Sequence, residues 1–168
     1  MRHAIIHSIV VVLLAQHAVL ASQGTRAGSE IPISLDGNVL VVPLTIRGAS
    51  KVLRFVVDTG AEITIVNKRT AKALGLPPGT DIDLETVGRE TTIPTVELKA
   101  LRIGSYEAAE VRAASYDLSD LTAAMDSPVD GVLGIDVLSQ FSFTIDYGRK
   151  IMSISASGAR KSSRSRER

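Results

Sequence analysis

The 168-residue chain contains no cysteine and no tryptophan, and its three histidines all lie within the first 17 residues. Beyond that segment the chain offers neither imidazole nor thiol, which excludes Ser-His-Asp and Cys-His nucleophilic machinery. Zinc sites built on nitrogen or sulfur ligands are excluded for the same reason. Without disulfides, stability must come from burial or oligomerisation. The chemistry that remains is that of carboxylates, Ser-Lys pairs or metals held by oxygen.

Aromatic residues are also scarce, at 4% of the chain, so the core must be built from Val, Ile, Leu and Ala. The charges nearly balance, with 19 basic and 18 acidic residues. This balance gives no general reason to expect nucleic-acid binding, and we expect no nucleic-acid partner. Without Arg2 and the last nine residues, 13 basic and 17 acidic residues remain, so the body is net −4.

The two ends differ in composition from the body. Arg2 and His3 precede an apolar stretch that continues to Ala21, with small residues before Ser22, which is typical of a secretory signal peptide. We therefore expect an exported protein, periplasmic or extracellular, with an uncleaved leader that anchors it in the membrane as the alternative. The predicted organisation is a signal peptide (1–21), a linker (22–30), one folded domain (31–157) and a basic disordered tail (158–168). The tail is Ser/Arg-rich and is expected to be solvated, with weak contact to an anionic surface as a minor alternative.

Alternating apolar residues predict strands through most of the mature chain. The pattern predicts an edge strand at 31–35, a hairpin from Leu40 to Val57, a strand at 63–66 and strand-like segments from 81 to 116. A looser segment follows at 117–128, and a hairpin closes the chain from Phe141 to Ile154. Short helices are expected at 68–74, capped by Asn67, and in a segment that runs through Leu138. The predicted fold is a single mainly-β, barrel-like domain with one or two short helices.

The strongest chemical signal is Asp58-Thr59-Gly60-Ala61, which directly follows the apolar strand Leu53–Val57. The strand delivers a carboxylate from the sheet into a tight turn, and Gly60 frees the backbone to approach a ligand closely. The Thr59 hydroxyl can donate to a neighbouring carbonyl and stiffen the loop. A carboxylate at the edge of an apolar core is a candidate for general acid–base work. As a bare tripeptide, however, Asp-Thr-Gly would be better explained as an ordinary type I or II turn after a strand.

A second element accompanies it, Gly131-Val132-Leu133-Gly134, which leads into a short helix before the final hairpin. An apolar strand that runs into Asp-Thr-Gly-Ala, then an apolar-apolar-Gly element, then a hairpin, resembles the retropepsin-like (clan AA) aspartic proteases, particularly single-domain bacterial ones with signal peptides. The resemblance covers roughly residues 31–155. It implies a closed, single-lobed acid-protease β-barrel and a flap around Val87, Gly88 and Arg89.

The resemblance also implies roles for the motif residues. Asp58 would be the catalytic carboxylate, Thr59 the hydroxyl that braces the loop, and Gly60 and Ala61 backbone next to a peptide or protein substrate. Catalysis would need no cofactor and no metal, because two such aspartates activate a water between them. The chain has one Asp-Thr-Gly, and Asp130-Gly131 lacks the Thr, so the expected site is shared by the two subunits of a homodimer.

Other candidates carry less weight. Asp136 and Asp146 are interpreted as a helix-start residue and an outward strand residue, and Tyr106 and Tyr116 as packing residues. A Ser-Lys dyad stays open on composition alone. Four further acids could bind Ca²⁺, but their spacing does not match an EF-hand loop, and a solvated loop is the preferred interpretation. These acids are Asp117, Asp120, Asp126 and Asp130. The functional alternatives are a non-catalytic module of the same fold that binds a peptide or partner, and a structural envelope protein in which Asp58 is only a turn residue.

Overall fold

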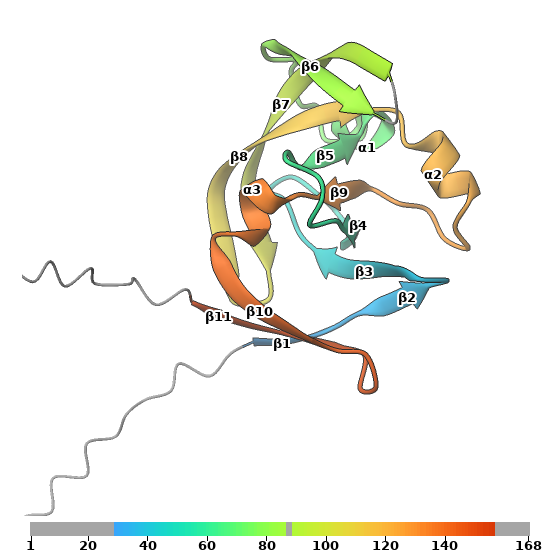
Figure 1. Cartoon of the computed structure of the whole chain (residues 1–168). Helices are drawn as coiled ribbons and strands as arrows, with labels where there is room; N and C mark the ends of the chain where they lie inside the picture. The colour runs from blue at the N-terminus through green and yellow to red at the C-terminus, as the bar shows by residue number, and fades with distance from the viewer. Residues whose placement is uncertain (1–28, 87–88, 157–168) are drawn as a thin grey trace, which may run out of the picture.

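The computed structural model describes residues 29–86 and 89–156, and within them the chain forms eleven strands and three short helices (Figure 1). The strands are β1 (Ser29–Pro32), β2 (Ser34–Asp36), β3 (Val39–Leu44), β4 (Leu53–Val57), β5 (Ile65–Asn67), β6 (Asp81–Thr86), β7 (Arg89–Ile103), β8 (Tyr106–Tyr116), β9 (Gly131–Leu133), β10 (Phe141–Asp146) and β11 (Ile151–Ala156). The helices are α1 (Lys68–Ala73), α2 (Ser119–Ala123) and α3 (Ile135–Leu138). The predicted leader, most of the linker and the basic tail lie outside the described residues. None of the helices in the described part of the chain is long and apolar enough to cross a membrane.

The strands form two sheets that together enclose the core. The larger sheet has the order β2-β3-β4-β9-β5-β8-β7-β6, and the smaller has the order β1-β11-β10. Thr45, just after β3, exchanges both backbone hydrogen bonds with Arg102 of β7, at 3.0 and 2.8 Å. Because β3 and β7 lie toward opposite ends of the larger sheet, this bridge closes the sheet on itself. The predicted mainly-β, barrel-like, single-lobed fold is confirmed.

The centre of the large sheet consists of three short strands whose order in the sheet differs from their order in the chain. β9 lies between β4 and β5, parallel to β4 and antiparallel to β5. Residues 131–133 therefore separate two strands that follow one another in the chain. This placement brings the end of β9 directly beside the loop that joins β4 to β5.

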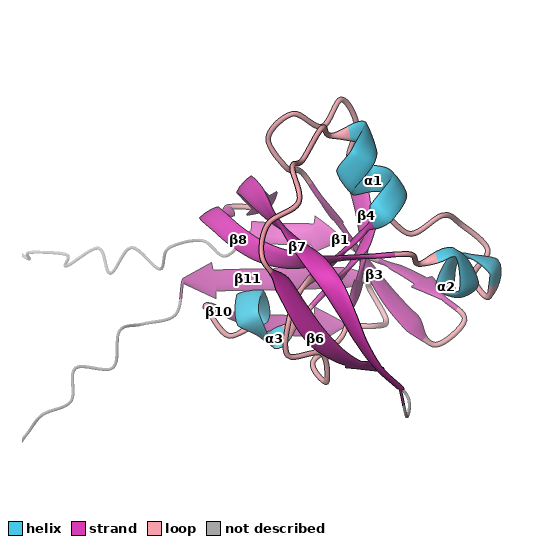
Figure 2. Cartoon of the chain, turned by 90° about the horizontal axis from the view of Figure 1, so that it is seen from above, coloured by secondary structure: helices cyan, strands magenta, loops and turns pink. Residues whose placement is uncertain are grey.

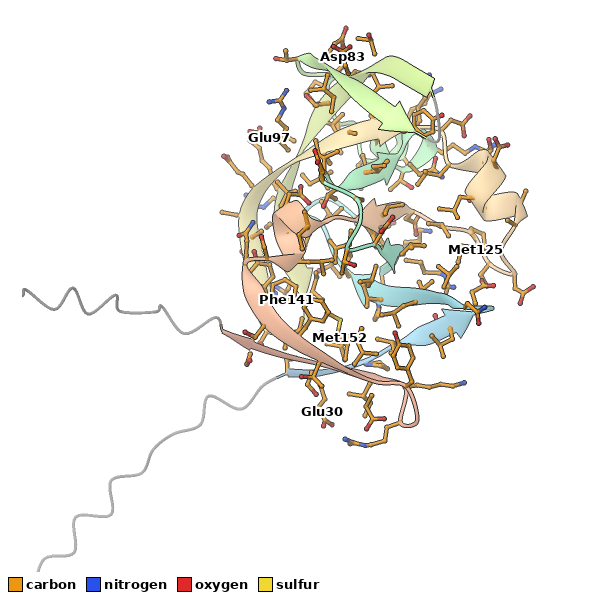
Figure 3. The ribbon with its side chains drawn as sticks, in the orientation of Figure 1. Glu30, Asp83, Glu97, Met125, Phe141 and Met152 are labelled. Carbon is orange, nitrogen blue, oxygen red and sulfur yellow. The ribbon has the colours of Figure 1, made fainter. Side chains whose placement is uncertain are left out.

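Two apolar clusters occupy the two faces of this central region. Alternation along β4 sends Leu53 and Phe55 into the main core, and Val56 to the opposite face. Phe141 of β10 and Met152 of β11 point into the main core as well, whereas Glu30, Asp83 and Glu97 point outward (Figure 3). The second cluster consists of Val41, Val56, Leu118, Val129 and Val132, and half-buried Leu121 and Met125 of the α2 region pack against it.

Several local predictions are confirmed. The hairpin β3–β4 and the closing hairpin β10–β11 are antiparallel pairs, as expected. The helix after Asn67 is α1, with the Asn67 side-chain oxygen accepting the Arg69 N–H at 3.1 Å. The chain leaves that helix through Gly75, whose φ of +63° favours glycine.

Three predictions of local structure need correction. The strand expected at 31–35 divides at Ile33 into β1 and β2, which pair in different sheets, because the Ile33 N–H turns to the Lys150 carbonyl. The strand expected at 63–66 begins at Ile65, since Thr64 forms side-chain contacts described below. The segment 117–128 contains α2, so the described residues hold three helices rather than one or two.

Candidate active site

The loop between β4 and β5 begins with the Asp58-Thr59-Gly60-Ala61 motif. The Asp58 N–H donates to the Leu133 carbonyl at 3.1 Å, which extends the β4–β9 ladder by one residue. An Asp58 side-chain oxygen accepts the Gly60 N–H at 2.8 Å, and the Asp58 carbonyl accepts the Ala61 N–H at 3.3 Å. The carboxylate is therefore oriented by its own turn, and the turn by the neighbouring strand.

Asp58, Thr59 and Gly60 are exposed in the single chain, and Ala61 is half-buried. The sequence predicted a carboxylate at the edge of an apolar core, whereas in the structure Asp58 is exposed to solvent. Val57 is already half-buried where β4 leaves the sheet, so the loop emerges at the surface. An exposed turn that is held by hydrogen bonds in this way can present a carboxylate to a ligand or to a second protein surface.

The apolar-Gly element packs against the inner side of this loop. Val132, Leu133 and Gly134 are all buried, and the Ile135 N–H donates to the Ala61 carbonyl at 2.8 Å. A Cβ on Gly134 would come within 2.7 Å of the Ile63 backbone, so the loop and the start of α3 can approach this closely only because Gly134 has no side chain. The structure thus brings together the two motifs that the sequence singled out.

Sequence reasoning missed a second contact between the same two segments. Thr64, which is fully buried, donates from its hydroxyl to one Asp136 carboxylate oxygen at 2.8 Å and from its backbone N–H to the other at 3.0 Å. The same hydroxyl accepts the Gly134 N–H at 3.1 Å. Asp136 does start a helix, as expected, but its side chain binds the Asp58 loop. A polar Thr inside the apolar run Ile63–Val66 was the available signal.

Asp130 corrects the sequence-based interpretation of the acidic segment 117–130. It was expected in a solvated loop, but it is 7% exposed and accepts hydrogen bonds from the Arg54 N–H and the Thr70 hydroxyl, both at 3.0 Å. The exposed Lys51 ammonium lies 3.3 Å away. These donors compensate the carboxylate for its lost hydration, so it joins β4, α1 and β9. Within the described residues, no three His, Cys, Asp or Glu side chains gather where they could hold a metal ion.

The predicted flap falls on the hairpin β6–β7. Thr86 pairs with Arg89, the first residue of β7, while Val87 and Gly88 lie outside the described residues. The two strands stay paired back to Asp81 and Pro94, and the hairpin extends away from the body in the view from above (Figure 2).

A short polar network continues behind α3. The Gln140 side chain donates to the Asp136 carbonyl at 2.9 Å and accepts the Tyr106 hydroxyl at 2.7 Å. Partial burial raises the pKa of Tyr106, and the nearby Asp136 carboxylate raises it further. The Tyr106 ring lies 4.5 Å from the Phe141 ring and Tyr116 packs against the second cluster, which agrees with the expected packing roles.

A closed single-lobed β-barrel, in which a strand ends in Asp-Thr-Gly against an apolar-Gly element, defines the acid-protease class of fold. A family model described as "Aspartyl protease" matches residues 42–137, from β3 through α3. The match spans more than half of the chain and includes both motifs, so the chain belongs to this aspartyl protease family.

The solved structures that are similar to this chain include the following two. One is a retropepsin-like aspartic protease from Rickettsia conorii, with a TM-score of 0.53 and 19% identity over 76% of this chain and 90% of that one. The other is the retroviral protease-like domain of Ddi1 from Leishmania major, with a TM-score of 0.44 and 19% identity over 73% and 97% of the two chains. A search of curated proteins gave no match. The similarity to the Rickettsia structure supports the retropepsin-like fold predicted from the sequence.

Proposed function

We propose that this chain is an aspartic endopeptidase that works as a homodimer, with one Asp58 from each subunit. The observation that carries the proposal is that, in the single chain, the motif forms a hydrogen-bonded turn whose carboxylate is exposed. The Asp58 turn is held by Leu133, Ala61 and Gly60, yet its carboxylate is exposed. A second copy related by a two-fold axis would bring an identical carboxylate to the same place.

In such a dimer the two Asp58 carboxyl groups would share one proton, because like charges about 3 Å apart cannot both ionise. The ionised carboxylate takes a proton from the water that attacks the peptide carbonyl. The protonated partner donates to the developing oxyanion, and a proton then passes to the leaving amine. No covalent intermediate forms, which suits a chain without cysteine and with histidine confined to its first 17 residues.

The remaining motif residues take supporting roles in this proposal. Thr59 braces the loop, Gly60 and Ala61 present backbone to a peptide or protein substrate, and the β6–β7 hairpin covers the bound substrate as a flap. The enzyme works in an exported compartment, periplasmic or extracellular, after the leader has directed it there. Fractionation of cells that produce the full chain tests this location, and recovery in the cytoplasm would contradict it.

The activity is tested with the purified chain and a mixed peptide library across pH. We expect cleavage that is fastest at mildly acidic pH, where one of the two carboxyl groups carries the proton, and that pepstatin-type inhibitors block. Specific activity should fall on dilution in step with loss of the dimer measured by light scattering. A pH–rate profile still rising above neutrality, or constant specific activity of a monomer, would contradict the shared site. Peptide binding without cleavage would favour the non-catalytic module.

A further inference from the structure

The Asp58 loop is held at two places, and at one of them a side-chain carboxylate accepts two of the hydrogen bonds. At its start, the loop is attached by backbone hydrogen bonds to β9 and α3, through Leu133 and Ile135. At its end, the Thr64 carbonyl accepts the Ala114 N–H at 2.9 Å, and the Thr64 hydroxyl and N–H donate to the two Asp136 carboxylate oxygens, at 2.8 and 3.0 Å. Bonds between backbone groups survive a change of side chain, whereas both bonds to Asp136 are lost if the Asp136 side chain is shortened. Loss of the Thr64 hydroxyl removes only one of them, because the other comes from the Thr64 N–H.

The Asp136 carboxylate contributes little else to the stability of the fold. It is half-buried in the first turn of α3, and the helix is fixed to the main core by the fully buried Val137 and Leu138 instead. Its carboxylate therefore acts on the Asp58 loop and not on the core. A charged acceptor forms stronger hydrogen bonds than a neutral one, and two oxygens on one residue fix orientation as well as distance.

We propose that Asp136 is a positioning residue for Asp58: its carboxylate holds Thr64, and through Thr64 it sets where the loop presents the catalytic carboxyl group. The inference rests on the proposed function, since it assigns a role in that reaction. Two Asp58 carboxyl groups that share a proton must meet within hydrogen-bond distance. A displacement of either loop is repeated in the partner by symmetry, so a small shift has a doubled effect on the pair.

The test compares Asp136→Ala and Asp136→Asn with the matched control Asp36→Asn. Asp36 is also a half-buried carboxylate whose two oxygens accept a backbone N–H, that of Asp126 at 3.1 Å, but it holds the α2–β9 loop. At protein concentrations where the dimer is complete, we expect Asp136→Ala to lower kcat by about 10²-fold with KM within about twofold. Asp136→Asn should lie between Asp136→Ala and the native chain, and Asp36→Asn should stay within about threefold of native kcat.

Thr64 supplies the second arm of the test. Thr64→Ser keeps the hydroxyl and should retain most of the activity. Thr64→Val removes the hydroxyl bond but keeps the N–H bond to Asp136, so it should lower kcat, though less than Asp136→Ala does. The loss in the double variant Thr64→Val/Asp136→Ala should be smaller than the sum of the two single losses, because both changes remove the same hydroxyl–carboxylate bond. Additive losses, or an Asp136→Ala variant with native kcat, would overturn the proposal.

Hydrogen exchange gives a readout that does not depend on activity. Because the Thr64 N–H is bonded to Asp136, its exchange should become about tenfold faster in Asp136→Ala and stay unchanged in Asp36→Asn. Unchanged exchange at Thr64 would overturn the proposal even in an active enzyme. Faster exchange in a chain that shows no Asp58-dependent cleavage would instead support the attachment and refute the proposed function.

Discussion

Asp130 and Asp58 both lie against the central strand β9, one before its first residue and one beside its last, but their surroundings differ. Asp130 is 7% exposed and accepts hydrogen bonds from Arg54 and Thr70, while Asp58 is exposed and accepts the Gly60 N–H within its own turn. A buried carboxylate that accepts hydrogen bonds from two other elements, β4 and α1, stabilises a fold. An exposed carboxylate on a fixed turn costs the fold little and stays accessible for chemistry. The difference separates a residue that holds the molecule together from one that is expected to react.

The sharpest way to test that contrast is Asp58→Asn. Asn has almost the same shape and its oxygen can still accept the Gly60 N–H, but it cannot act as a base. We expect cleavage to fall by roughly 10²–10⁴-fold or more, while the free energy of unfolding is unchanged. Peptide cleavage assays and urea unfolding measure the two quantities. Activity retained within a few-fold would exclude the aspartic mechanism.

Asp130→Ala should show the opposite behaviour. The Arg54 N–H and the buried Thr70 hydroxyl would lose their acceptor, at a cost of about 1–3 kcal/mol for each donor. Urea unfolding measures the loss. The control is Lys51→Ala, which removes only the ion pair of a largely exposed ammonium and should cost less than about 1 kcal/mol. Equal losses in the two variants would contradict the assigned role of Asp130.

Thr59→Val tests whether the exposed Asp58 loop contributes to the proposed dimer. Thr59 is exposed in the single chain, so removal of its hydroxyl should leave the monomer as stable as before. If the hydroxyl reaches the partner loop in the dimer, its loss leaves a buried group without a partner, at about 1–3 kcal/mol per site. Sedimentation or light scattering should then show a clearly weaker dimer. An unchanged dissociation constant would refute a role for Thr59 at the dimer axis.

The smallest effect on stability is expected at Tyr106, whose hydroxyl donates to Gln140, which in turn donates to the Asp136 carbonyl of α3. Tyr106→Phe removes the hydrogen bond to Gln140 and should cost about 0.5–1.5 kcal/mol. Because the folded state raises the pKa of Tyr106 above 10.0, it retains the phenol proton more tightly than the unfolded chain does. The stability that the folded state gains from this raised pKa is therefore complete below about pH 10. It is lost as the pH rises through the pKa of Tyr106 in the folded state. Unfolding measured on both sides of pH 10 should show a smaller alkaline loss in the Phe variant than in the native chain, and identical losses would contradict this.

Much of the fold could be predicted from local patterns. Alternation located β4 and the closing hairpin, Asn67 and Gly75 marked the two ends of α1, and the Asp-Thr-Gly turn was recognised directly after its strand. These features depend on residues close together in the chain, so their signals are local. The division of the first strand and the presence of α2 were missed, because each depends on contacts with distant segments such as Lys150 and the second apolar cluster.

By itself, the sequence limited the chemistry available to this protein, because it contains an Asp-Thr-Gly motif but no cysteine, and no histidine beyond residue 17. It also determined the strand alternation that makes a mainly-β domain. Only the tertiary structure decided what the other carboxylates near the motif bind. Asp130 and Asp136 look alike in the sequence as acids beside the apolar-Gly element, but one is buried among Arg54 and Thr70 and the other holds Thr64. Their partners lie 60 to 76 residues away along the chain, and it is the insertion of β9 between β4 and β5 that brings them within hydrogen-bond distance.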